Sequence, residues 1–195
     1  MRTEVIMVIS FLLFELPVFA VIGLLLYAPI YWIGKRRTGK RPFLRHFVLW
    51  TFLCYCLSLT FLTLLWYWPD ITFRPELFFL NLRPFVWVTE TYEMGVTKML
   101  EQLALNIGMF VPLGILLPMV FPRLRRFWRT ALVVLLTTAA IETLQYFMGR
   151  SADIDDVIMN FAGGVLGYAL FVLLRRLFGK CRWWRNAIGE KADIG

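Results

Sequence analysis

An acidic residue inside an otherwise apolar stretch is the first feature of this sequence that could support chemistry. Glu142 is followed three residues later by Gln145, and this spacing places both side chains on one face of a helix. An ionisable group at the centre of a membrane-spanning helix costs about 2.5–3.5 kcal/mol on insertion scales, so it needs a partner or a purpose. The carboxyl group of Glu142 can act as a general acid or base, or it can bind a ligand. The structural alternative is a Glu142 that is neutral or paired with Arg83 or Arg150.

A second group of polar residues follows Arg150. Asp153, Asp156 and Asn160 have the spacing i, i+3, i+7, which places them on one face if a helix begins near Asp153. Carboxylate oxygens are ligands for Mg²⁺ and Ca²⁺, so Asp153 and Asp156 can hold a divalent cation if one is present. The structural alternative is that Asp153 caps the helix, while Asp155 and Asp156 are favourable charges in its first turn.

Small residues continue the face that carries these acids. Gly163, Gly164 and Gly167 lie on or beside it, and Gly163 and Gly167 form a GxxxG pair. Such pairs allow two helices to approach closely within a membrane. We therefore expect this stripe to pack inward against its neighbouring helices.

The chain that carries these residues is both very apolar and basic. Hydrophobic residues make up 59% of its 195 residues and charged residues 17%, against about 45–50% and about 25% in soluble proteins. Its formal net charge is +8. This composition argues against a soluble nucleic-acid-binding protein and a disordered chain. Cys54, Cys56 and Cys181 show neither a disulfide framework nor a metal-binding spacing. A multi-span membrane protein that binds no nucleic acid is expected.

Membrane spans need about 20 apolar residues, and five runs qualify. The runs are Val5–Ile33, Phe47–Trp68, Leu103–Phe121, Thr130–Met148 and Val157–Phe178. The predicted fold is an all-α, polytopic membrane helix bundle with about five transmembrane helices. We divide it into an N-terminal span with a basic loop (1–45), a membrane domain (46–178) and a basic-aromatic tail (179–195).

The loop charges predict how the chain is oriented. Most of the 21 Lys and Arg residues lie in the loops at 34–46 and 122–129 and in the tail after 178. Basic loops stay in the cytoplasm, so the N-terminus is expected outside and the C-terminus in the cytoplasm. The loops at 69–102 and 149–156 then face outward. The outer part of the chain thus includes the acids around Asp153.

The same orientation brings polar residues from three spans to one level. Asn106, Glu142 and Asn160 are each expected one or two helical turns below the outer surface. The segment Leu77–Trp87 is too short to span the membrane and too apolar to be fully solvated. It should lie on the outer surface or re-enter as a half-helix.

Four motifs between about His46 and Phe171 resemble the VanZ-like family. They are Asn81-Leu82-x-Pro84-Phe85, Asn106-x-x-x-Phe110-x-Pro112-Leu113-Gly114, Glu142-x-x-Gln145 and Arg150-x-x-Asp153-x-Asp155-Asp156-x-x-x-Asn160-x-x-Gly163-Gly164-x-x-Gly167-Tyr168. Arg83 departs from the family pattern, which has an aliphatic residue there. The resemblance implies a bacterial inner-membrane protein associated with glycopeptide resistance, toward teicoplanin more than vancomycin. It implies no agreed set of catalytic residues.

The first hypothesis is a protein that binds or shields a ligand in an outward-facing polar pocket. The ligand would be a lipid-linked cell-wall intermediate or a lipoglycopeptide, reached from among the membrane lipids. The predicted pocket residues are Asn81, Arg83, Asn106, Glu142, Gln145, Arg150, Asp153, Asp156 and Asn160.

Two alternatives remain open. The first is an enzyme that modifies a lipid or undecaprenyl-linked headgroup at the outer leaflet. It is less favoured because the only histidine, His46, is on the predicted cytoplasmic side and has no serine partner. The second is a subunit of a small transporter, which would need a homo-oligomer because five spans make a thin wall. Apart from the divalent cation considered above, no cofactor is expected.

Overall fold

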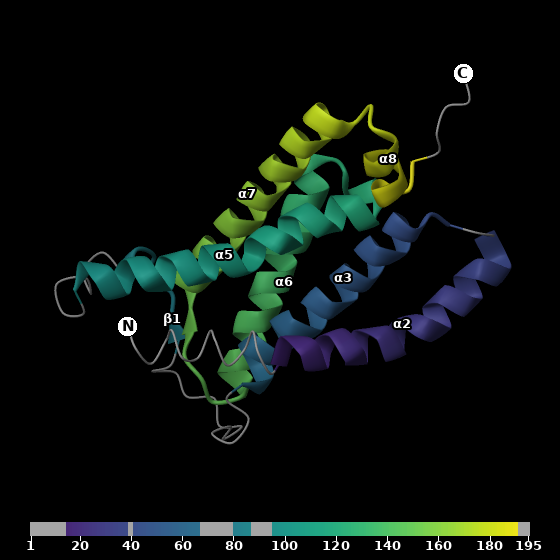
Figure 1. Ribbon diagram of the computed structural model, residues 1–195. Helices are drawn as coiled ribbons and strands as arrows, with labels where there is room; N and C mark the ends of the chain where they lie inside the picture. The colour runs from purple at the N-terminus through teal and green to yellow at the C-terminus, as the bar shows by residue number, and fades with distance from the viewer. Residues whose placement is uncertain (1–14, 39–40, 67–79, 87–94, 191–195) are drawn as a thin grey trace. The chain divides into compact units, whose positions relative to one another are not determined.

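The structure is a computed structural model that describes residues 15–38, 41–66, 80–86 and 95–190 (Figure 1). Five of its helices are long and apolar enough to cross a membrane, so the chain is a multi-pass membrane protein. The predicted all-α bundle with about five spans is confirmed. In chain order, the described elements are α2 (Leu16–Thr38), α3 (Phe43–Thr60), the π-helix η2 (Phe61–Leu65), β1 (Leu80–Asn81), α5 (Val96–Val120), the 3-10 helix η5 (Pro122–Leu124), α6 (Phe127–Phe147), β2 (Ala152–Asp153), α7 (Ile154–Phe178) and α8 (Arg182–Ile188).

Helices α5 and α7 begin earlier than the apolar runs that predicted them. Helix α5 begins at Val96 rather than Leu103, and α7 begins at Ile154 rather than Val157. An apolar run ends at its first charged residues, whereas a helix accepts such residues in its first turns. Acidic residues are even favourable there, because the positive end of the helix dipole lies at the N-terminus.

The first predicted span, Val5–Ile33, is described only in part. Residues 5–14 lie outside the described residues, and α2 continues beyond the predicted end to Thr38. Pro29 lies inside α2 and Pro112 inside α5, yet both helices continue through them. Membrane helices tolerate proline because neighbouring groups can satisfy the freed backbone.

The chain forms two compact units. One comprises residues 1–61 and 180–195, and the other comprises residues 62–179. The predicted domain boundaries after residues 45 and 178 stay a prediction.

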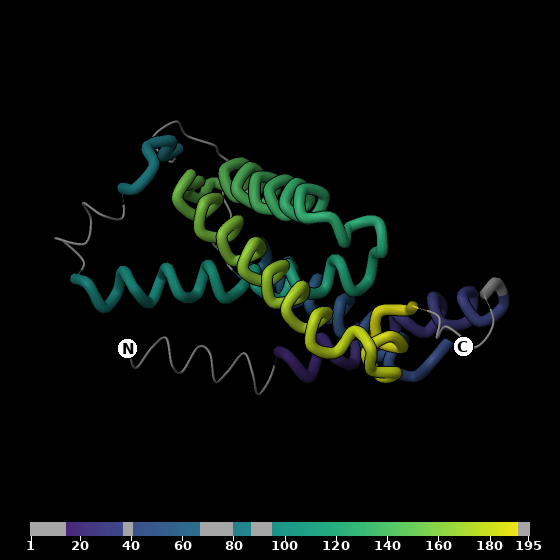
Figure 2. Tube along the Cα trace, turned by 90° about the horizontal axis from the view of Figure 1, so that it is seen from above, coloured from purple at the N-terminus to yellow at the C-terminus, as the bar shows by residue number. Residues whose placement is uncertain are grey.

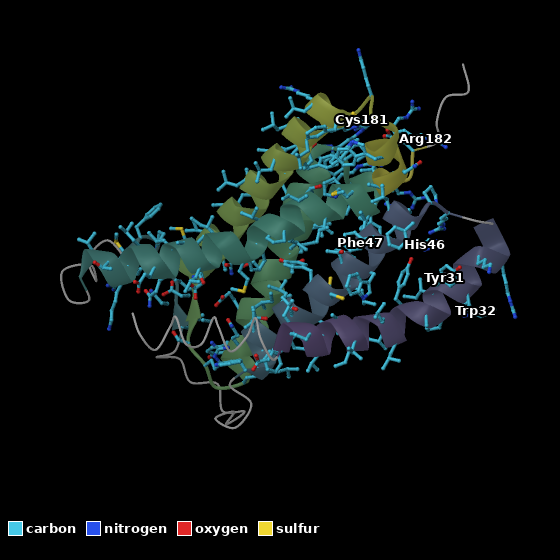
Figure 3. The ribbon with its side chains drawn as sticks, in the orientation of Figure 1. Tyr31, Trp32, His46, Phe47, Cys181 and Arg182 are labelled. Carbon is cyan, nitrogen blue, oxygen red and sulfur yellow. The ribbon has the colours of Figure 1, made fainter. Side chains whose placement is uncertain are left out.

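The first unit contains α2, α3 and α8. Helices α2 and α3 run antiparallel, and α8 packs on α3. Trp50 Nε1 donates to the carbonyl oxygen of Ala20 at 3.3 Å, and the Tyr27 hydroxyl lies 2.7 Å from Nδ1 of His46. Tyr31 and His46 face each other across these helices, with ring centroids 4.9 Å apart (Figure 3). The histidine of this chain therefore belongs to a helix–helix contact within the first unit.

The second unit is built on α5, α6 and α7. Helix α7 crosses α5 closely and also packs on α6 (Figure 2). A Cβ atom at Gly163 would lie 2.9 Å from the carbonyl carbon of Ile107. One at Gly167 would lie 2.9 Å from Cα of Gly114, while Gly164 faces α6. The structure thus places the predicted glycine stripe inward, where the helix backbones approach too closely for a side chain.

The core of this unit lies between the three helices. Phe110 of α5 and Val134 of α6 have no exposed surface, and Phe171 of α7 is 1% exposed. Thr138 is also fully buried in α6 and lies opposite α7. The three helices therefore share one packed interior, and polar groups enter it at specific positions.

Candidate functional site

A short parallel strand pair joins two distant parts of the second unit. Leu80 of β1 pairs with Ala152 of β2, and Asn81 pairs with Asp153. Because β2 directly precedes α7 in the chain, this pairing places β1 beside the start of α7. In the described part of the predicted segment Leu77–Trp87, β1 is followed by a turn at residues 84–85, and Val86 is helical. Residues 77–79 and 87 lie outside the described residues. Placement of this segment at the membrane surface stays a prediction.

Asp155 holds the turn that follows β1. Its two carboxylate oxygens accept hydrogen bonds from the backbone N–H groups of Phe85 at 2.6 Å and Val86 at 2.8 Å. Phe85 has a φ of +66°, in the left-handed region that a residue with a side chain adopts at a cost. Asp155 is buried, and from the sequence it was expected only as a charge in the first turn of a helix. Its role depends on a contact 70 residues away, which no local pattern signals.

Asp153 is the N-cap of α7 and also contacts β1. One carboxylate oxygen accepts from the backbone N–H of Asp155 at 2.8 Å, which is the capping interaction. The other accepts from the side-chain amide of Asn81 at 3.0 Å. The structural alternative for Asp153 therefore describes it correctly. The side-chain oxygen of Asn81 in turn accepts a hydrogen bond from the backbone N–H of Arg83, and Arg83 is exposed.

Glu142 approaches the same junction from α6. Its Oε2 accepts from the backbone N–H of Asp153 at 3.1 Å, and the residue is only 7% exposed. A buried carboxylate thus satisfies a backbone donor just before α7 begins, where helices leave such donors unpaired. Glu142, predicted as a possible general acid, base or ligand-binding group, is held against the N-terminus of α7.

The amides of α5 and α7 complete the polar contacts between the helices. Asn106 donates to Oδ1 of Asp156 at 2.6 Å. One turn deeper along α7, the amide nitrogen of Asn160 lies 3.2 Å from the Thr138 hydroxyl. Oδ1 of Asn160 is buried and has no hydrogen-bond partner among the described residues. The structure therefore brings Asn106, Glu142 and Asn160 to contacts between the same three helices.

Gln145 and Arg150 meet at a different point. Their side chains donate to one backbone oxygen, that of Thr63, at 3.0 Å and 2.7 Å respectively. Thr63 lies in the π-helix η2, and π-helical turns change the backbone bonding of an ordinary helix. Both donors were predicted as pocket residues, but here they tie the end of α6 to η2.

A cavity of about 360 Å³ opens beside the strand pair. Its lining is mostly apolar and comes from β1, α6, β2 and the start of α7. The lining residues are Leu80, Leu82, Ala139, Glu142, Thr143, Tyr146, Phe147, Ala152, Asp153, Ile154 and Val157. Of the nine predicted pocket residues, only Glu142 and Asp153 line it. This cavity combines an apolar wall with two carboxyl groups. We call it the outer cavity, because the predicted orientation of the chain would place it on the outer side of the membrane.

The sequence suggested that Asp153 and Asp156 can hold a divalent cation, but in the structure both carboxyl groups are bound by side-chain amides. Each carboxylate accepts a hydrogen bond from a side-chain amide, that of Asn81 or Asn106. Within the described ranges, no three His, Cys, Asp or Glu side chains are grouped so that they could hold a metal ion. The contacts seen here are those of carboxylates that order helices and strands.

The protein is a polytopic membrane protein with five candidate spans. Its helices α5 and α7 cross closely at glycine residues, and acidic residues lie at the start of α7. The family model for VanZ/LLP1 proteins matches residues 47–175. The chain belongs to the VanZ/LLP1 family, and the predicted family resemblance is confirmed. No curated protein and no solved structure gives a significant match.

Proposed function

We propose that this protein binds or shields a lipid-linked ligand in the outer cavity, and thereby contributes to resistance to teicoplanin-type lipoglycopeptides. The observation that carries the proposal is a mostly apolar cavity of about 360 Å³ with the buried carboxyl group of Glu142 in its wall. Family membership and the five candidate spans support a role in the bacterial inner membrane. With the N-terminus outside, as the basic loops favour, this cavity faces the cell wall.

The lining indicates the chemistry of the ligand. Apolar side chains such as Leu80 and Val157 suit an acyl chain. The carboxyl groups in the lining, those of Glu142 and Asp153, can accept hydrogen bonds, and no Lys or Arg is among the described lining residues. An amphiphile with an N–H or ammonium group beside its chain fits this wall better than one that ends in a phosphate.

The cavity wall is ordered before any ligand arrives. Asp153 holds β1 through Asn81, and Asp155 holds the following turn through two backbone N–H groups. A wall that is already ordered loses less conformational entropy when a ligand binds. The acids near the start of α7 thus support binding, although most of them do not line the cavity.

Two neighbouring alanines on α6 allow a matched test. Ala139 lines the outer cavity, whereas the adjacent Ala140 is exposed and is not among the lining residues. Ala139→Phe is expected to fill the cavity and to reduce protection against teicoplanin, while Ala140→Phe leaves it unchanged. Protection is measured as the inhibitory drug concentration at matched membrane expression, with vancomycin in parallel. Equal protection by both variants would contradict the proposal.

The same cavity also allows a test of the enzyme alternative. The observation that favours it is that Glu142 is a buried carboxyl group that lines a lipid-sized space. An enzyme would change the lipids of cells that express the protein, and Glu142→Gln would abolish that change. Mass spectra of lipid extracts with and without the protein compare these outcomes. Unaltered lipids together with lost drug protection in Ala139→Phe support binding rather than reaction.

A further inference from the structure

A second cavity lies at the other end of α6, where the chain turns from α5 through η5. Its volume is about 610 Å³. Its described lining consists of Leu117, Phe121, Pro122, Arg123, Leu124 and Val133, of which only Arg123 is not apolar. We propose that this loop cavity binds an anionic phospholipid, with the lipid phosphate on Arg123 and an acyl chain along the apolar wall. This site is independent of the outer cavity.

Charge is the first argument for an anionic occupant. The loop carries Arg123, Arg125, Arg126 and Arg129, and no Asp or Glu occurs between residues 102 and 141. Arg125 and Arg129 donate to backbone oxygens within or next to the loop. Among the described residues, no side chain pairs with the guanidinium of Arg123 or Arg126. Basic pockets between membrane helices are suited to anionic lipid headgroups.

The loop is held in one conformation by bonds to its backbone oxygens. Arg129 Nη1 donates to the carbonyl oxygen of Arg123 at 3.1 Å, and the Tyr168 hydroxyl of α7 donates to that of Arg125 at 2.7 Å. The Thr130 hydroxyl donates to the carbonyl oxygen of Leu124. Because these carbonyl oxygens already accept hydrogen bonds, the groups of the loop that can bind a ligand are the arginine guanidinium groups. Such preorganisation lowers the cost of binding.

Exposed aromatic residues place this loop at the level of the lipid headgroups. Phe127 is 51% exposed and Trp128 57% exposed at the start of α6. Arg129 lies over the Trp128 ring, 5.0 Å from its centroid. Tryptophan beside arginine is typical of the membrane–water interface. A phosphate held at Arg123 would therefore come from a lipid whose chain lies in the adjacent cavity, rather than from a soluble compound.

Two variants separate the headgroup from the chain. Arg123→Gln removes the charge that lines the loop cavity, and Arg176→Gln removes the same charge from an exposed position in the last turn of α7. Val133→Phe fills the cavity without changing charge, and Leu132→Phe adds the same ring at the exposed neighbouring position. The full chain is purified in detergent and titrated with phosphatidylglycerol, phosphatidylcholine or glycerophosphate. Bound lipid is counted by native mass spectrometry.

The wild-type protein is expected to prefer phosphatidylglycerol over phosphatidylcholine by about fivefold or more, the effect of one arginine near an anionic headgroup. Arg123→Gln should abolish the preference, Val133→Phe should weaken the binding of both lipids, and both control variants should behave as wild type. Glycerophosphate should not displace the lipid. An absent preference, an equal loss in Arg176→Gln, or displacement by glycerophosphate would each overturn the proposal.

Discussion

The turn after β1 is held by one carboxylate, so a single substitution tests how the wall of the outer cavity is built. Asp155 accepts from the backbone N–H groups of Phe85 at 2.6 Å and Val86 at 2.8 Å. A hydrogen bond to a charged group contributes about 1.5–3 kcal/mol. Asp155→Asn replaces one acceptor oxygen by an N–H donor, so at least one of these bonds is lost. Because residue 85 is exposed, water can partly replace the lost acceptor.

We therefore expect the free energy of local opening to fall by about 1.5–3 kcal/mol, which corresponds to roughly 10- to 150-fold faster amide exchange. Hydrogen–deuterium exchange of a peptide that covers residues 80–86 measures this effect. Asp156→Asn is the matched control, because it makes the same carboxyl-to-amide change in the same helical turn, at a side chain that contacts Asn106 instead of the turn after β1. If residues 80–86 exchange equally fast in both variants, the two hydrogen bonds of Asp155 do not hold the turn.

Two further substitutions test the packing of the second unit. Gly167→Ala would place a Cβ 2.9 Å from Cα of Gly114, and it should cost about 1–3 kcal/mol through overpacking. Gly108→Ala, which meets no atom within 4 Å, should leave the thermal unfolding temperature in detergent unchanged or raise it. Tyr168→Phe removes the hydrogen bond to the carbonyl oxygen of Arg125 and should cost about 0.5–1.5 kcal/mol in a denaturant titration. Equal unfolding curves for Gly167→Ala and Gly108→Ala would contradict the close helix crossing.

Local patterns in the sequence were enough to predict the helices and their inward faces. Apolar runs predicted five spans, and the GxxxG spacing predicted the stripe that packs against α5. These features depend only on side-chain hydropathy and on the 3.6-residue period of a helix. The N-cap role of Asp153 also follows from local chemistry, since an aspartate directly before a helix can accept from its first N–H groups.

The contacts of the predicted pocket residues could not be predicted in this way. Gln145 and Arg150 were expected to face a ligand, yet both donate to the carbonyl oxygen of Thr63, more than 80 residues earlier in the chain. The pattern of a helix face shows which residues point the same way. It does not show which distant backbone group will lie opposite them once the chain is packed.

The three aspartates at the start of α7 separate what local sequence can predict from what depends on the tertiary structure. Residue types and spacing established that acids precede and begin a membrane helix, and that they can cap it. Packing assigned each acid a different partner: Asp153 contacts β1, Asp155 the turn after it, and Asp156 helix α5. Successive residues of a helix point about 100° apart, so their surroundings depend on which segments the tertiary fold brings to each side.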